Sequence, residues 1–322
     1  MSSEPAVDIV TVTYDSAPHL AAYVEGVSAL DYPPERLRLV VVDNASNDDT
    51  RRRLSELLPQ LPFAAELVES ERNAGFGAAC NLGAARGSAP FVLFLNPDAT
   101  PAPDMLRRLV GRALAEPRAG LVDAAQEPSG LAKWCDPATG DTDWCSGAAA
   151  LARRTALAGV GGFDPFFFLY CEDIDLSWRM WLAGWRCLHE PRARVRHEVG
   201  LPGGGVKPSE LLHMIRNSFS MRLIYDAPRG VLAHLARGAR YLASPRTEAA
   251  TRSAVAGGMW TAARGLRHLL RRRRAARSAL RGSGERARFV FTEWYYGRWL
   301  GEGEDASRPA SVAARAEWQG YQ

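Results

Sequence analysis

Short apolar runs alternate with amphipathic segments through the first part of the chain. The apolar runs fall at residues 7–14, 37–43, 64–70 and 91–98. Runs of this length between polar turns predict buried β-strands. Segments with helical spacing follow within residues 15–29, 44–58, 73–87 and 103–117. Strands that alternate with helices over short connections predict an α/β fold with a mostly parallel central sheet flanked by helices.

The pattern changes after the fourth helical segment. Residues 120–144 are rich in Gly, Pro and Asp and are expected to be irregular. A short strand, a helix, a Gly-Gly-Phe-Asp turn, a helix at about Asp173–Ala183 and a last strand in "CLHEPRARVRHE" should follow. Beyond Pro208 the spacing is helical, with breaks near Pro228, Pro245 and Gly282. We therefore expect an α/β unit over residues 1–205, a helical extension over 206–300 and a flexible tail over 301–322.

Three acidic residues lie where predicted strands end. Asp15 and Asp43 follow the first two strands, and Asp98 closes the apolar run in "FVLFLNPDAT" (residues 91–100). Pro97 prevents the strand ladder from continuing and stiffens the turn that presents Asp98. Parallel α/β sheets bind ligands outside the carboxyl ends of their strands, so these acids are candidate site residues. For Asp43, ending a strand and capping a helix is an equally good explanation.

The densest group of acids lies in "CEDIDLSW" (residues 171–178), beside several Phe, Tyr and Trp residues. Burial against aromatic rings raises the pKa of a carboxyl group, which is how a general base is tuned. The simpler alternative is that Glu172, Asp173 and Asp175 only interact with the positive end of a helix dipole. His197 follows the last predicted strand. It becomes a candidate Mn²⁺ or Mg²⁺ ligand if Asp98 lies opposite it.

Composition narrows the class of protein. The chain has 322 residues, 47% of them hydrophobic, which suits one large domain or a domain with an extension. No apolar stretch approaches the length of a membrane span, and no secretory signal is recognisable at the N-terminus. The five cysteines form no CxxC pair, so we expect reduced thiols in a cytoplasmic protein.

One motif suggests a different class of enzyme. "GFGAAC" (residues 75–80) is similar to the glycine fingerprint of dinucleotide-binding proteins. The third glycine is missing, and the motif follows the third predicted strand instead of the first. A dehydrogenase is therefore not expected.

Seven blocks, in this order, resemble family 2 inverting glycosyltransferases, and among them the bacterial rhamnosyltransferase-like branch. The blocks span roughly residues 7–217 and read "TVTYDS", "VVVDNASNDDT", "NAGFGAACNLG", "FLNPDA", "CSGAAALARR", "GGFDPFFFLYCEDIDLSWRMWLAGW" and "RHE". The resemblance implies a GT-A fold, with a nucleotide-sugar half over about residues 1–100 and an acceptor half over about residues 101–205. It also implies a transferase that uses a nucleoside-diphosphate sugar.

The resemblance also assigns roles to individual residues. Ser146, Gly147 and Ala148 would lie under the acceptor and the sugar. Residues that line the nucleotide and donor site would be Thr13, Tyr14, Asp15, Asp43, Asn73, Gly75, Asn81, Asn96 and Asp98.

The same resemblance implies which residues would bind the metal and which would act as the general base. Asn96-Pro97-Asp98 would occupy the family's Asp-x-Asp motif, with Asn in place of the first acid, and Asp98 and His197 would hold Mn²⁺ or Mg²⁺. Asp173 would be the general base, with Glu172 beside it. The metal would stabilise charge on the leaving diphosphate while the acceptor attacks from the opposite face, as in inverting glycosidases.

The substrates are less well defined. Among donors, dTDP-rhamnose is favoured over UDP-sugars, and the acceptor is a glycan, a lipid-linked saccharide or a small molecule. Two other classes are kept as alternatives. A nucleotidyltransferase would need a basic N-terminal loop, which "TYDSAPHL" (residues 13–20) does not supply. A non-catalytic sugar-nucleotide-binding module would be consistent with Asn96 but not with the retained Asp98, Asp173 and His197.

Charge separates the two parts of the chain. Residues 1–200 carry 19 basic and 27 acidic side chains, and residues 201–322 carry 21 and 9. The block "GLRHLLRRRRAARSALRG" (residues 265–282) is either a solvated helix face or a basic amphipathic surface. The second explanation predicts peripheral attachment to the anionic inner face of the membrane. Nucleic acid is not an expected partner, because basic residues alone do not specify it.

Overall fold

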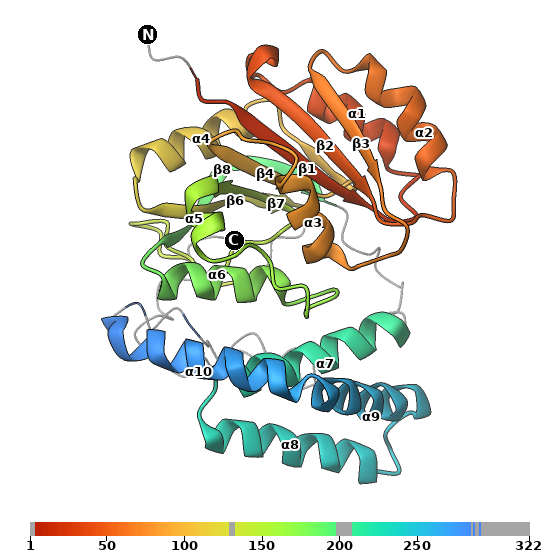
Figure 1. The fold of residues 1–322 in the computed structure, drawn as a ribbon, viewed down its shortest axis with the longest axis vertical. Coiled ribbons are helices and arrows are strands. Elements are labelled where there is room, and N and C mark those ends of the chain that lie inside the picture. Colours follow the sequence, from red (N-terminus) through yellow and green to blue (C-terminus); the bar gives the residue numbers. More distant parts are fainter. Residues whose placement is uncertain (1–3, 129–132, 198–207, 285, 287–289, 291–322) are drawn as a thin grey trace.

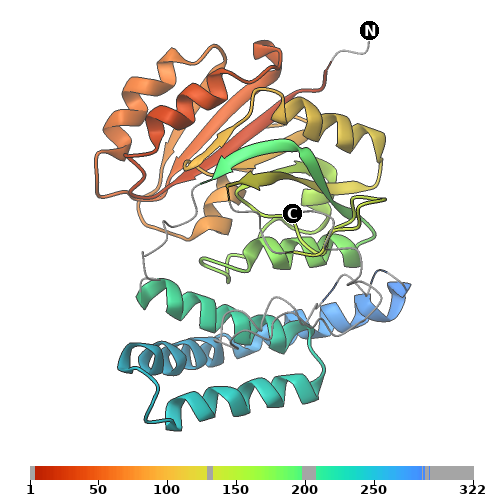
Figure 2. The same ribbon diagram turned by 180° about the vertical axis from the view of Figure 1, so that it is seen from behind.

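The computed structural model describes residues 4–128, 133–197, 208–284, 286 and 290. Two layers are visible in Figure 1, where an α/β part with a central sheet lies above a layer of C-terminal helices. Helix α6 (Glu172–Leu182) lies between the sheet and that helical layer in both views (Figures 1 and 2). Helix α6, which carries the candidates Glu172 and Asp173, therefore has the sheet on one side and the C-terminal helices on the other.

The N-terminal half forms a parallel sheet, as its apolar runs predict. Its strands are β1 (Val7–Thr13), β2 (Leu37–Asp43), β3 (Ala64–Glu69) and β4 (Phe91–Leu95), in the spatial order β3-β2-β1-β4. Val7 of β1 pairs with Leu37 on one side and Phe91 on the other. The carboxyl ends of these strands therefore meet at one edge, where Asp15, Asp43 and Asp98 follow them.

The second half completes an eight-stranded mixed sheet of order β3-β2-β1-β4-β7-β6-β8-β5. Its strands are β5 (Ala99–Pro101), β6 (Ala119–Glu127), β7 (Ala149–Arg153) and β8 (Arg186–His197). Strand β7 runs antiparallel to β4 and β6, and β5 runs antiparallel to β8. Only β6 and β8 are parallel in this half.

The expectation that residues 120–144 are irregular is wrong for their first third, because β6 is a long strand near the middle of the sheet. Asp123 and Gln126 interrupt its apolar pattern, and such residues normally argue against a buried strand. Here both find partners beyond the strand, most of them buried and some far along the chain. Asp123 binds Lys133 and His189, and Gln126 binds His197. These long-range contacts remove the cost of burying the two side chains.

Helices cover both faces of the sheet. One face packs against α1 (Leu20–Ser28), α2 (Thr50–Leu57) and α4 (Met105–Ala115). The other packs against α3 (Phe76–Ala84), α5 (Arg154–Gly159) and α6. Short 3₁₀ turns at Pro34–Arg36 and Leu58–Gln60 complete the connections.

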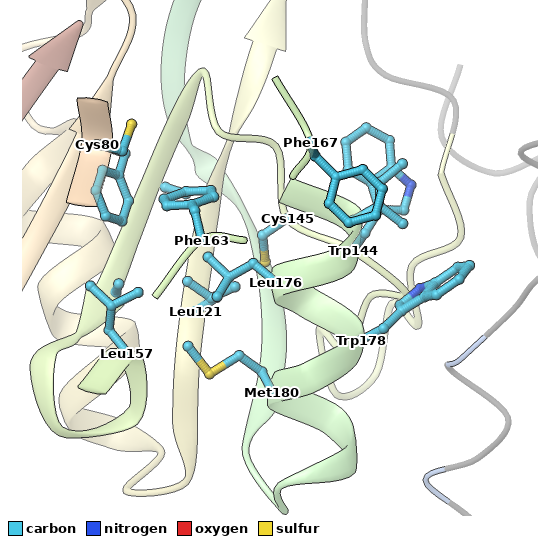
Figure 3. Packing of buried hydrophobic residues seen from close by; sticks show 14 of the residues in the cluster. Cys80, Leu121, Trp144, Cys145, Leu157, Phe163, Phe167, Leu176, Trp178 and Met180 are labelled. Carbon is cyan, nitrogen blue, oxygen red and sulfur yellow. The ribbon is translucent and has the colours of Figure 1, made fainter. Parts of the chain in front are cut away.

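Aromatic residues fill the core between the sheet and α6. Figure 3 shows Phe163 of the Gly-Gly-Phe-Asp turn, the following Phe167, and Trp178 and Met180 of α6 in one buried cluster. The ring of Phe163 meets that of Phe94 on β4 edge to face, at 5.0 Å between centroids. This packing holds the first turn of α6 against the sheet, since large buried rings tolerate little displacement.

Four helices form the second layer, close to the breaks predicted at Pro228, Pro245 and Gly282. They are α7 (Pro208–Tyr225), α8 (Pro228–Ala243), α9 (Ala249–Arg264) and α10 (Leu266–Gly282). The sequence did not indicate the further break at Gly265, where the chain turns beneath the ring of Phe166. The tail predicted for residues 301–322 lies outside the described residues. None of the described helices is long and apolar enough to cross a lipid bilayer.

An arginine of α10 joins this layer to the catalytic half. Arg272 pairs with Asp164 of the Gly-Gly-Phe-Asp turn and, at 2.7 Å, with Asp175 of α6. Its guanidinium also donates to the hydroxyl of Tyr225 on α7 at 3.3 Å. Burial alone would raise the pKa of Asp175, but Arg179 and Arg272 outweigh it, so the pKa lies below its ordinary value. Arg272 therefore adds a second basic partner to each of two buried acids, since Asp175 also pairs with Arg179 and Asp164 with His268.

Replacing Arg272 tests this joint. The side chain of Arg272 is 19% exposed and that of Asp175 is fully buried. We expect Arg272→Leu to lower the free energy of unfolding by about 3 kcal/mol, the low end for breaking a buried ion pair, because Arg179 and His268 still face the two carboxylates. Arg271→Leu on the exposed face of the same helix is the matched control and should unfold like the wild type. Denaturant titration measures the stability of both variants. Equal stability would contradict a stabilising role for the contacts of Arg272.

Candidate active site

The turn Asn96-Pro97-Asp98 and the end of β8 meet at the edge of the sheet. Ala99 of β5 pairs with His197 of β8, and this register places the Asp98 Oδ1 atom 3.3 Å from His197 Nε2. Burial disfavours the ionised form of Asp98, but the hydrogen bond and charge of His197 outweigh burial. The pKa of Asp98 therefore lies below its ordinary value. The pair predicted from two distant segments is thus brought together.

His197 faces an acceptor on each side of its ring. Its Nδ1 lies 2.8 Å from Gln126 Oε1, and its Nε2 lies toward Asp98. A neutral imidazole has a single N–H, so one of its two nitrogens needs a proton or a cation. When Nδ1 donates to Gln126, Nε2 is left with a lone pair directed at a carboxylate. A divalent cation between them would satisfy both groups, and the second hydrogen bond would orient the ring as in known metal sites.

Asn96 supplies a further oxygen at this turn. Its Oδ1 is buried and has no hydrogen-bond partner among the residues that the structure describes. Such an acceptor is costly unless something binds it. Oxygen and imidazole donors together suit Mn²⁺ or Mg²⁺. Within the described ranges no group of three or more His, Cys, Asp or Glu side chains is placed to hold a metal. Asp98, His197 and Asn96 therefore stay candidate donors at this turn.

The predicted base, Asp173, is held at the first turn of α6. Its Oδ2 accepts a hydrogen bond from the Gly147 amide at 3.1 Å, and its Oδ1 accepts one from the Ile174 amide at 2.8 Å. A side chain at Gly147 would press on the Phe76 ring, with its Cβ 3.1 Å from that ring. Glycine therefore lets this loop approach α6 without displacing the Phe76 ring.

The two acids at this turn both have raised pKa values. Burial is the main cause that raises the pKa of Asp173 to about 6. Glu172 is more deeply buried, and burial together with the charge of Asp173 raises its pKa well above the ordinary value. Burial and the neighbouring Asp173 thus both disfavour a negative charge on Glu172. Two adjacent acids with separated pKa values are typical of a catalytic site.

The backbone before α6 is strained. Tyr170 and Cys171 both adopt φ of 69°, a left-handed conformation that residues with a side chain rarely take. Asn217 of α7 donates to the carbonyls of Leu169 and Tyr170, at 2.8 and 2.7 Å, and so helps to hold this conformation. Strain of this kind persists where the surroundings enforce it, and it is concentrated at functional sites.

Backbone hydrogen bonds connect the metal candidates to the base. The Asn96 amide donates to the Ala148 carbonyl at 2.9 Å, next to the Gly147 amide that binds Asp173. The structure thus joins Asn96-Pro97-Asp98, Ser146-Gly147-Ala148 and the start of α6 through consecutive contacts. The Ser146 amide in turn donates to Asp123 at 3.0 Å. One connected set of strand ends and turns therefore carries these predicted residues.

Asp123 belongs to a buried cluster that the sequence analysis missed. It forms an ion pair with Lys133 and lies 2.9 Å from His189 Nδ1. Burial opposes ionisation of Asp123, but Lys133 and His189 hold its pKa below the ordinary value. Asp123 is also a neighbouring negative charge that contributes to the raised pKa of Asp173. A buried carboxylate supported by two basic side chains thus supports the loop that binds Asp173. No local signal around Asp123 marks these partners.

The predicted nucleotide side forms a second group at the ends of β1 and β2. Asp43 is buried and accepts a hydrogen bond from Thr13 Oγ1 at 3.2 Å, while Arg51 Nε binds it at 2.5 Å. Asp15 accepts from the Asn47 amide at 2.7 Å, which ties the loop after β1 to the loop after β2. Tyr14 projects into solvent, with 48% of its surface exposed. Arg51, not considered from the sequence, compensates the charge of Asp43.

Asn73 and Gly75 shape the next turn. Asn73 Oδ1 accepts hydrogen bonds from Asn44 Nδ2 and from the Gly75 amide, both at 2.9 Å. Gly75 has φ of 88°, and a Cβ there would lie 2.5 Å from the Phe168 carbonyl oxygen, so only glycine fits. Asn44 is a further residue that the sequence analysis did not single out.

Asn81 is engaged in a structural contact. Its Nδ2 donates to the Phe163 carbonyl at 2.8 Å, and its Oδ1 accepts from the Phe163 amide at 2.9 Å. Both atoms of this amide therefore hold the Gly-Gly-Phe-Asp turn against α3. Asn81 was predicted to shape the wall of the nucleotide site. It could do so only indirectly, by positioning this turn.

Proteins named as rhamnosyltransferases are similar to this chain in sequence. An L-rhamnosyltransferase of Mycobacterium tuberculosis, which acts on N-acetylglucosaminyl-diphospho-decaprenol, is 29% identical over 235 residues, covering 59% of this chain and 75% of the relative. The rhamnosyltransferase WbbL of Escherichia coli is 46% identical over 55 residues, 17% of this chain and 21% of that protein.

Solved structures agree on the fold. The mannosyltransferase PcManGT of Pyrobaculum calidifontis, solved with GDP-Man and Mn²⁺, superposes with a TM-score of 0.55 at 22% identity, covering 90% of this chain and 86% of that one. GalNAc-T7, solved with UDP, GalNAc and Mn²⁺, gives a TM-score of 0.59 at 14% identity, covering 83% and 58%. The predicted GT-A fold is confirmed.

The family model for glycosyl transferase family 2 matches residues 8–175, slightly more than half of the chain. This range contains the strand-end acids, the metal candidates on the Asn96 turn and the first turn of α6. The chain therefore belongs to glycosyl transferase family 2, and its relatives place it with the rhamnosyltransferase-like members.

Proposed function

We propose that this enzyme inverts the anomeric centre of a sugar as it moves it from a nucleoside-diphosphate donor to an acceptor hydroxyl. The observation that carries the proposal is the position of Asp173. Its carboxylate is held by the Gly147 amide, beside the turn that carries Asp98. A base at this position would face an acceptor lying over the turn, while the diphosphate would bind at the strand ends.

Asp173 would remove the proton from the acceptor hydroxyl as that oxygen attacks the anomeric carbon. With its pKa at about 6, the group is largely ionised at neutral pH and is a stronger base than an ordinary Asp. The Gly147 and Ile174 amides hold both carboxylate oxygens, which limits rotation of the side chain. Burial and the charge of Asp173 raise the pKa of Glu172, which disfavours a second negative charge at this turn.

A divalent cation would be held by Asp98 and His197, with Asn96 as a neutral third donor. When bound, it would supply positive charge against the leaving diphosphate. Gln126 orients the imidazole through Nδ1, so that Nε2 is presented as a ligand. Two of the similar structures were solved with Mn²⁺, which favours this ion.

We propose a dTDP-sugar donor, with rhamnose as the transferred sugar and UDP-sugars as the next candidates. The base and ribose would bind where Thr13, Asp43 and the Asn73–Gly75 turn meet. For the acceptor we favour a lipid-linked saccharide over a soluble glycan or small molecule, because the mycobacterial relative is named for such an acceptor. Catalysis would occupy residues 1–205, and the helices that follow would attach the enzyme to the cytoplasmic face of a membrane.

The base assignment predicts a pH dependence. A protonated carboxylic acid cannot accept a proton, so kcat/KM should fall about tenfold per pH unit below pH 6 and level off above it. Asp173→Asn should lower kcat by at least about 10²-fold and leave the affinity for the nucleotide sugar unchanged. Transfer assays and ligand-induced thermal shifts measure the two quantities. Substantial turnover by the Asn variant would place the base elsewhere.

The metal assignment predicts a different loss. Asp98→Asn should weaken Mn²⁺ binding by at least about tenfold, because it removes the charged ligand while keeping the size of the side chain. Asp104→Asn is the matched control, since Asp104 is an exposed acid paired with Arg108 a few residues away. Calorimetric titration with Mn²⁺ alone measures the affinity. An unchanged titration of the Asp98 variant would rule out this site.

A further inference from the structure

Large apolar side chains are exposed mainly on the C-terminal helices. Among the described residues, the exposed ones outside this layer are Tyr14, Leu82 and Leu114. The remaining six lie between residues 232 and 270 and are Leu232, Leu235, Leu242, Trp260, Leu266 and Leu270. Single exposed leucines need no explanation, but a concentration of them on one part of a molecule marks an interaction surface.

On helix α8 the exposed apolar residues are arranged most regularly. Its buried side, with His234 and Gly238, packs toward α7 and α9 through the Phe219 ring and Met259. With 3.6 residues per turn, six of its exposed apolar residues share an arc of about 120° next to the buried side, whereas the exposed Ala233 lies outside that arc. The six residues, named here the α8 stripe, are Leu232, Leu235, Ala236, Ala239, Leu242 and Ala243.

The charge around the α8 stripe has a single sign. Residues 228–282 contain thirteen arginines and only one carboxylate, Glu248. On the helical projection Arg229 and Arg240 border the α8 stripe, and both are exposed. Helix α10 adds an exposed row consisting of Arg267, Arg271, Arg274, Arg277 and Arg281.

Only part of this charge is needed by the fold. Arg272 binds Asp164 and Asp175, and Arg273 donates to the carbonyls of Leu223 and Asp226. These two members of the arginine block face the protein, so only its exposed row is available either as a solvated helix face or as a membrane surface. The exposed arginines and the α8 stripe remain to be explained.

We propose that α8 is a membrane-docking helix that lies in the plane of an anionic lipid surface with its leucines among the acyl chains. An amphipathic helix with an apolar stripe bordered by arginines has the composition of an interfacial helix. The exposed arginines would pair with lipid phosphates near the surface. Figures 1 and 2 both show α8 as the outermost helix, on the side of the molecule away from the sheet.

Other occupants fit these observations less well. Nucleic acid would pair with arginines but would leave the leucines in water. A second copy docked through the same face would bring arginines against arginines. A lipid surface satisfies both the apolar and the basic groups. The inference deepens the proposed function, because a lipid-linked acceptor would be presented at the same surface, yet docking can be measured without any transfer.

Vesicle flotation of the full chain tests the proposal. The wild type should float with phosphatidylcholine–phosphatidylglycerol vesicles, bind phosphatidylcholine vesicles much less, and detach as salt is raised. Leu232→Glu combined with Leu235→Glu should lower the affinity for anionic vesicles by at least about tenfold. Leu114→Glu on α4 is the matched control, since Leu114 is 53% exposed and lies far from α8 in sequence and layer. The control should float like the wild type.

Three results would overturn the proposal. They are undiminished flotation of the α8 double variant, equal flotation of wild type with both vesicle types, and flotation only after the chain is shortened beyond Gly284, which would mean that the tail covers α8. Circular dichroism and thermal shifts with nucleotide sugars on the same variants should match the wild type. If the wild type failed to bind any nucleotide sugar, the proposed function would fail while the flotation result stood.

Discussion

The hydrogen bond from the Gly147 amide to the Asp173 carboxylate connects a turn of the central sheet to helix α6. Gly147 belongs to the turn before β7, and that turn is bound in register to Asn96 at the end of β4. Asp173 belongs to α6, which packs on the sheet through Trp178, Phe163 and their neighbours. A bond between an amide and a carboxylate is worth roughly 1.5–3 kcal/mol, and here it also sets the distance between the base and the metal candidates. If α6 shifted, Asp173, the predicted base, would no longer lie beside the metal candidates.

Buried polar groups on β6 stabilise this arrangement. Asp123 lies below the Ser146 amide and is neutralised by Lys133, while Gln126 holds the ring of His197. Neither residue needs to touch a substrate for this role. Each occupies a position where a hydrophobic residue would fit a strand better, and each is tolerated because its partner is also buried and well placed. Strand β6 therefore connects the loop that binds the base with the ligand that would bind the metal.

The C-terminal helices have two distinct surfaces. Toward the catalytic half, Arg272 and His268 bind Asp164, and Arg272 also binds Asp175, two residues after the base. Away from it, the α8 stripe and the exposed arginines face solvent. The same residue type thus serves both as a buried counter-ion and as a surface charge. Which role an arginine takes depends on the direction in which its helix presents it, since neighbouring arginines of α10 point to opposite sides.

Local pattern alone determined the parallel half of the sheet, its flanking helices and the acids that follow its strands. Each of these depends on periodicity, β-branched content or a proline within a few residues. The pairing of Asp98 with His197 could be anticipated only through resemblance to a family. Tertiary structure alone decided that β6 is a strand, that Asn81 binds a turn and that Arg272 enters the protein while Arg271 does not. In each case the deciding partner is distant along the chain, and the energy of a buried polar group depends on that partner more than on its own neighbours in sequence.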